Sequence, residues 1–167
     1  GGCVAAWRAV TLIKELGLRP RRTLRVVLWT NEENGSRGSK NYRDEHFSEL
    51  ENHIVAIESD GGVFAPQGFG FTGSEEARKI LFDIADLLDP ISAGDITNWG
   101  RAPDIAILND EGVPVLSLNV DNSKYFWYHH TSADTFDKVD YREFNNCIAA
   151  MAIMAYVVAD MEEKLPR

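Results

Sequence analysis

The sequence predicts an α/β fold with a mostly parallel central sheet and helices on both faces, and three observations support this class. Apolar runs without polar alternation are typical of strands that are buried on both faces, as in parallel sheets. These runs alternate along the chain with segments whose apolar residues recur at helical spacing. Glycine and proline separate the segments. The 167 residues are enough for one domain with a sizeable core, so we predict a single domain over residues 1–167.

The first half of the chain begins with a helix over residues 4–16. Trp7, Val10 and Ile13 share one helical face there, and Gly17 is a favourable residue for ending the helix. The segments expected next are a strand over residues 24–29, a polar helix over residues 36–46, a strand over residues 54–58 and a glycine- and aromatic-rich loop over residues 61–73.

The second half opens with a helix that begins at Ser74. A serine can cap a helix, and the acids Glu75 and Glu76 favour its positive N-terminal end, while Pro90 ends it. The segments expected next are an irregular stretch over residues 91–103, a short helix over residues 104–108, a strand over residues 113–118, a long aromatic loop over residues 119–137 and a last helix over residues 141–165.

Side chains that can bind a metal follow the predicted strands. Glu32 and Glu33 come directly after the first strand, Asp60 follows the second, and His130 lies in the aromatic loop. Alone, each signal is weak, because a glutamate pair is usually a solvated loop and Asp before glycine is usually a turn. Open α/β sheets, however, bind ligands outside the carboxyl ends of their strands. Carboxylates and an imidazole at that edge suit a zinc-type hydrolytic site.

The composition of the chain limits the kinds of partner that it is expected to bind. The formal net charge of −9 argues against a nucleic-acid or anionic-membrane partner. Two cysteines, Cys3 and Cys147, cannot form a disulfide framework. The longest apolar run, residues 147–159, is too short to span a bilayer, so no membrane span is expected.

Nearly the whole chain resembles the co-catalytic di-zinc aminopeptidase and carboxypeptidase superfamily. The matching stretches are residues 12–20 (LIKELGLRP), 27–33 (VLWTNEE), 58–60 (ESD), 71–75 (FTGSE), 129–130 (HH) and 156–163 (YVVADMEE). A string of matches in this order is far more specific than a lone glutamate pair. The resemblance implies a zinc-peptidase-like three-layer sandwich whose N-terminal part is missing, so that residues 1–167 are a partial catalytic domain.

The resemblance also implies a role for each candidate residue. Glu32 corresponds to the general base and Glu33 to a zinc ligand, with His130 as the second ligand of the same zinc. Asp60 corresponds to a ligand of the other zinc. Asp134 is expected to steer the His130 loop without binding metal, because imidazole ligands usually need an orienting partner. The neighbouring His129 is out of register with the family pattern and is expected to be structural or close to the substrate.

The activity implied for the complete enzyme is hydrolysis of short peptides, especially dipeptides, with two Zn²⁺ ions as cofactor. Members of the superfamily are secreted or lysosomal and tend to form homodimers. The remaining ligands, an Asp that bridges both zincs and a His, are expected upstream of Gly1. The chain alone is therefore expected to be inactive.

Two alternatives remain open. Glutaminyl cyclases share the fold and are single-zinc acyltransferases, and the products formed from a peptide with N-terminal Gln would separate the two classes. A non-catalytic binding module of the same fold is the third hypothesis. Retention of all four candidate residues, Glu32, Glu33, Asp60 and His130, argues against loss of function in this half of the site.

Overall fold

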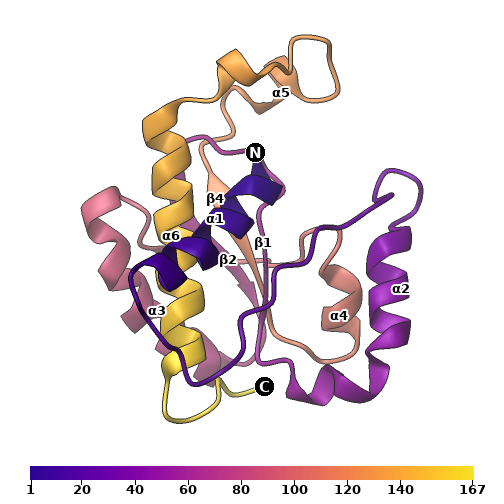
Figure 1. Ribbon diagram of the computed structural model, residues 1–167, viewed down its shortest axis with the longest axis vertical. Helices are drawn as coiled ribbons and strands as arrows, with labels where there is room; N and C mark the ends of the chain where they lie inside the picture. Colours follow the sequence, from indigo (N-terminus) through magenta and orange to yellow (C-terminus); the bar gives the residue numbers. More distant parts are fainter.

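The computed structural model describes residues 1–167 and places a four-stranded sheet between two layers of helices (Figure 1). The strands are β1 (Ala56–Glu58), β2 (Pro66–Thr72), β3 (Asp95–Asn98) and β4 (Val115–Val120). Their order in the sheet is β1-β4-β2-β3. The pairs β1–β4 and β2–β3 are parallel, whereas β2–β4 is antiparallel. The predicted α/β class and its mostly parallel sheet are confirmed, with one antiparallel pair at the centre.

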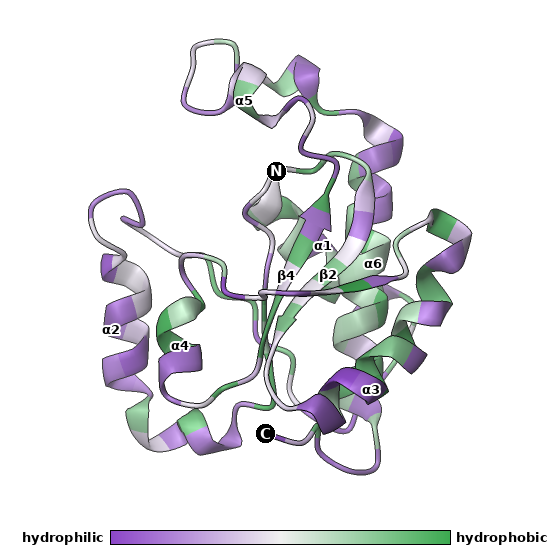
Figure 2. Ribbon diagram, turned by 180° about the vertical axis from the view of Figure 1, so that it is seen from behind, coloured by the Kyte–Doolittle hydropathy of each residue, from purple (hydrophilic) through white to green (hydrophobic).

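Helices cover both faces of the sheet. The α-helices are α1 (Gly2–Glu15), α2 (Arg37–Glu45), α3 (Glu75–Ala85), α4 (Ala106–Asp110), α5 (Tyr125–Tyr128) and α6 (Tyr141–Asp160), and the 3₁₀ helices are η1 (Phe47–Asn52), η2 (Asp86–Ile91) and η3 (Phe136–Lys138). In Figure 1, α1, α3 and α6 lie on one side of the sheet, and α2 and α4 lie on the other. Figure 2 shows that α2 is mainly hydrophilic, as predicted for residues 36–46.

The core lies between the sheet and the layer formed by α1, α3 and α6. Phe69 and Phe71 of β2 are fully buried there and pack with Leu116 of β4 and Met154 of α6. Large apolar side chains at every second position of β2 thus supply one face of the sheet, as the alternation of side chains along a strand requires. None of the helices combines the length and the hydropathy that a membrane crossing requires.

Most helix predictions agree with the structure, but α3 ends at Ala85, Pro90 lies inside the following η2, and the predicted aromatic loop contains α5. The Ser74 hydroxyl accepts a hydrogen bond from the Ala77 amide at 3.1 Å, which is the expected N-cap of α3. The last helix begins where predicted but ends at Asp160 rather than near residue 165. Asp140 caps its start by accepting hydrogen bonds from the backbone amides of Arg142 and Glu143.

The predicted strand over residues 24–29 is not a strand in the structure. This segment is extended but makes no backbone hydrogen bond, and the Leu28 side chain is 58% exposed. The apolar run indicated a strand, but a strand also needs a ladder of backbone hydrogen bonds, and residues 24–29 make none. Leu24 packs against the main core, and the Trp29 ring lies edge-on to Tyr42 at a centroid distance of 5.4 Å.

Two strands were not predicted. The segment over residues 61–73, expected to be a loop, contains β2, and the segment over residues 91–103 contains β3. Glycine is unfavourable in strands on average, yet at Gly70 a Cβ atom would lie 2.3 Å from the Trp99 carbonyl oxygen. Gly68 would bring its Cβ to 2.0 Å from the Asp95 carbonyl oxygen. Close approach of the backbones therefore requires the two glycines, and this need cannot be recognised from composition.

Candidate functional site

The Glu32–Glu33 pair lies on a tight turn that leads into α2. The preceding residue, Asn31, has a positive φ of 58°, a conformation that non-glycine residues adopt rarely and that is common at functional sites. The Glu32 carbonyl accepts hydrogen bonds from the amides of Gly35 at 2.9 Å and Ser36 at 2.8 Å. These bonds fix the turn. Glu32 is left half-buried, and Glu33 is exposed.

His130 is distant from this turn in the sequence but lies next to it in the structure. It follows α5, and its φ of 56° is also positive. Its Nε2 atom lies 2.7 Å from Oε1 of Glu33. The side chains are 60% and 68% exposed, respectively, so both present their polar atoms to solvent. The structure thus brings together the two residues that the resemblance assigns to one zinc.

Asp60 lies apart from this pair, in the turn after β1. No group of three or more His, Cys, Asp or Glu side chains is close enough to hold one ion. The chemistry of the Glu33–His130 pair nevertheless fits zinc, because an imidazole nitrogen and a carboxylate oxygen meet at a solvent-accessible point. These two residues therefore fit part of a zinc coordination sphere.

Tyr125 was not singled out by the sequence but lies among the candidate residues. Burial raises the pKa of its phenol, and the negative charges of Asp60, Glu33 and Asp134 raise it further. The charges of these three carboxylates therefore all act on one phenol, although the three side chains are not close enough to hold a single ion. The aromatic run before the histidine pair was the sequence signal that could have pointed to this tyrosine.

Asp134 makes no hydrogen bond with His130. It is exposed, and its backbone amide donates to the Thr131 carbonyl at 3.2 Å. The contact behind His130 is aromatic: the His129 ring stacks on the His130 ring at 3.8 Å and on the Tyr125 ring at 4.5 Å. The steering role predicted for Asp134 stays a prediction, and His129 is the residue that supports the His130 ring.

A buried acid pair lies beneath the site. Glu58 at the end of β1 accepts hydrogen bonds from the backbone amides of Ile105 at 2.9 Å and Asp104 at 3.5 Å. Burial raises the pKa of Glu58 to about 7, against the effect of the Ile105 hydrogen bond. Burial also raises the pKa of Asp104, and the charges of Glu32 and Asp60 add to this shift. Sequence reasoning missed both acids, although a glutamate that ends an apolar run was a visible signal.

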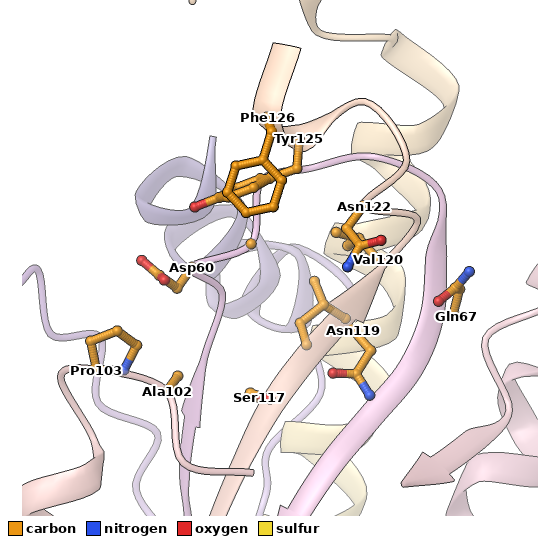
Figure 3. Close-up of a pocket in the computed structure, with 12 residues that line it drawn as sticks. Asp60, Gln67, Ala102, Pro103, Ser117, Asn119, Val120, Asn122, Tyr125 and Phe126 are labelled. Atoms are coloured by element: carbon orange, nitrogen blue, oxygen red, sulfur yellow. The ribbon is translucent and has the colours of Figure 1, made fainter. Parts of the chain in front are cut away.

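A cavity of about 440 Å³ opens beside Asp60. Figure 3 shows Asp60 at one side of it and the amide side chains of Asn119, Asn122 and Gln67 at the other. The rings of Tyr125 and Phe126 border it next to the residues described above.

Comparisons with known proteins agree on one relationship. The family model described as Peptidase family M28 matches residues 1–155. The chain is 46% identical over 167 residues to carboxypeptidase Q of Homo sapiens and 46% identical to that of Xenopus laevis, in both cases over 100% of this chain. It covers 35% and 36% of those proteins, so it spans about a third of their length.

One solved structure shows the same relationship in three dimensions. The crystal structure of a peptidase M28 precursor from Shewanella amazonensis has a TM-score of 0.94 and 35% sequence identity to this chain. The match covers 99% of this chain and 38% of that one.

Proposed function

This chain belongs to peptidase family M28, and we propose that it carries part of the active site of a zinc-dependent enzyme that hydrolyses short peptides, as a dipeptidase or carboxypeptidase. The observation that supports this most directly is the 2.7 Å contact between His130 and Glu33. The two residues are far apart in sequence, yet both point their metal-binding atoms at one solvent-accessible spot. Peptide hydrolysis is the activity that the names of the similar proteins share.

Each candidate residue has a distinct role in the proposed reaction. Glu33 and His130 would hold one zinc, and Asp60 would contribute to holding a second. Bound zinc would lower the pKa of a coordinated water to about 7 and polarise the scissile carbonyl. Glu32 accepts the proton of the attacking water as the new C–O bond forms, and donates it to the leaving amine as the C–N bond breaks. Adjacent glutamates are not redundant in this scheme, because one binds metal and the other moves a proton.

The direct test uses the full-length protein loaded with zinc. We expect hydrolysis of unblocked dipeptides, measured as release of the free amino acids. A strong chelator should abolish the activity, and added zinc should restore it, because the ligands hold the metal reversibly. Full activity in protein that metal analysis shows to be free of zinc would contradict the proposal. If a peptide with N-terminal Gln were cyclised instead of hydrolysed, the glutaminyl-cyclase alternative would replace it.

The isolated 167-residue chain is expected neither to bind two zinc ions tightly nor to hydrolyse dipeptides. Only Glu33 and His130 meet in it, and two protein ligands are fewer than the three that catalytic zinc sites use. The unpaired backbone of residues 24–29 is also expected to lower its solubility. Isothermal titration with zinc tests the binding, and two tight sites per chain would show that the ligand assignment is incomplete.

Three further assignments remain proposals. We treat residues 1–167 as part of one catalytic domain, because a single hydrophobic cluster joins α1, α3, α6 and the sheet. The family resemblance favours a secreted or lysosomal enzyme. It also favours a homodimer.

A further inference from the structure

The cavity beside Asp60 has a lining that discriminates between neutral and acidic groups. Its polar side chains are three amides, Gln67, Asn119 and Asn122, and the hydroxyls of Ser117 and Tyr125. No lysine, arginine or histidine lines it, and Asp60 is the only charged residue. A carboxylate placed there would have no cation to pair with, whereas a neutral polar group would find hydrogen-bond partners on several sides.

Asn119 is oriented by its neighbour on β3. Its Nδ2 atom donates a hydrogen bond to the Thr97 hydroxyl oxygen at 2.9 Å. The nitrogen is thereby directed toward β3, and the Oδ1 atom faces the cavity (Figure 3). Asn119 therefore presents a hydrogen-bond acceptor to whatever enters. A group with an N–H or O–H donor can satisfy this acceptor, but an ionised carboxylate cannot.

Asn122 supplies the complementary partner. Its side chain reaches the cavity from the segment before α5, and its amide nitrogen lies on the cavity side (Figure 3). An acceptor on β4 and a donor on the following loop form a pair that matches a carboxamide, which carries one of each. The cavity volume of about 440 Å³ lies within the range of small-molecule sites.

We propose that this cavity binds a neutral hydrogen-bonding side chain of the peptide substrate, best a carboxamide, and rejects the corresponding carboxylate. This inference rests on the proposed function, because it assigns the cavity to a peptide cleaved next to it. Asp60 and Tyr125 connect the cavity with the candidate site, because both residues border the cavity and both lie among the candidate residues.

The test compares glutamine with glutamate, which have nearly the same shape. Four dipeptides are used: Gln-Ala, Glu-Ala, Ala-Gln and Ala-Glu. Their binding to full-length Glu32→Gln protein, in which turnover is expected to be slow, is measured by calorimetry with and without zinc. At one of the two positions, glutamine should bind roughly 3- to 10-fold more tightly than glutamate, the usual effect of one hydrogen bond. The preference should persist without metal.

Variants locate the source of the preference. Asn119→Leu, in the Glu32→Gln background, removes the acceptor at nearly constant volume and should bring the glutamine-to-glutamate ratio close to one. Thr97→Val removes the hydroxyl that directs the Asn119 amide, at an exposed position, and should also lower the ratio, which keeps the test informative if Asn119→Leu fails to fold. The matched control is Asn52→Leu, an exposed position in η1 outside the cavity, which should leave the ratio unchanged.

The outcomes separate this inference from the proposed function. Hydrolysis of Ala-Ala by the wild-type enzyme without any glutamine preference would overturn the cavity assignment and leave the peptidase intact. Glutamine-selective binding without hydrolysis of any dipeptide would overturn the peptidase and leave the cavity assignment intact. A preference that survives both Asn119→Leu and Thr97→Val would also overturn the inference, because the selectivity would then arise elsewhere.

Discussion

Replacement of Glu32 by Gln in the full-length enzyme should lower the turnover rate by roughly 10²–10⁴, the usual contribution of a positioned general base, while the zinc content stays at the wild-type level. Glu32 is half-buried beside the Glu33–His130 contact and takes no part in it. The amide keeps the shape of the carboxylate but cannot accept the proton of the attacking water.

Glu33→Gln should fail in a different way. It removes the charge of the proposed zinc ligand, a carboxylate 2.7 Å from His130, so zinc affinity should fall together with activity, and excess zinc should restore part of the rate. Metal analysis and dipeptidase kinetics of both purified variants provide the comparison. Glu51→Gln is the control, since Glu51 is an exposed glutamate in η1. Loss of zinc from Glu32→Gln alone would show that the roles of Glu32 and Glu33 are the reverse of those proposed. Full activity in both variants would show that neither glutamate belongs to the active site.

Gly70→Ala should lower the free energy of unfolding by about 1–3 kcal/mol, which is the typical range for overpacking a filled site. The new Cβ atom would lie 2.3 Å from the Trp99 carbonyl oxygen and 3.1 Å from the Ser117 hydroxyl oxygen. The backbone of β2 is paired on both sides and cannot move away without disturbing the sheet, whereas Trp99 lies just beyond the end of β3. The expected response is a displacement of the segment around Trp99.

Gly61→Ala is the matched control for Gly70→Ala. Its Cβ atom would meet only Val120 Cγ2, at the ordinary contact distance of 3.7 Å, so a change within about 0.5 kcal/mol is expected. Urea unfolding of the full-length variants, followed by circular dichroism, measures the difference. Equal stabilities would show that residues near Trp99 adjust freely and that β2 tolerates a side chain at position 70.

Helices were more predictable from the sequence than strands, and the reason is local. Ser74 as a cap, the apolar spacing of α1 and the start of α6 all depend on residues within a few turns of one another. The strands depend on distant partners. Gly68 and Gly70 let neighbouring backbones approach β2 closely, whereas residues 24–29 make no backbone hydrogen bond with any other segment. No local pattern contains this information.

Within the candidate site, too, local signals could be predicted from the sequence and long-range contacts could not. Glu32, Glu33, Asp60 and His130 were predicted from their positions after apolar runs and from a family resemblance, and the structure joins Glu33 with His130. Tyr125 and the buried acids could not be assigned from the sequence. Their significance comes from what surrounds them, such as the amide of Ile105 above Glu58, and this is a property of the folded chain.

The contact between Glu33 and His130 joins positions 97 residues apart, and all four strands of the sheet lie in the intervening chain. Closing so long a loop is entropically costly until the intervening sheet has formed. We therefore expect the two residues to come together late in folding, after the sheet has formed. If they hold a metal ion as proposed, its occupancy would report whether the domain has finished folding, and a newly made chain would gain its metal and its native topology in the same step.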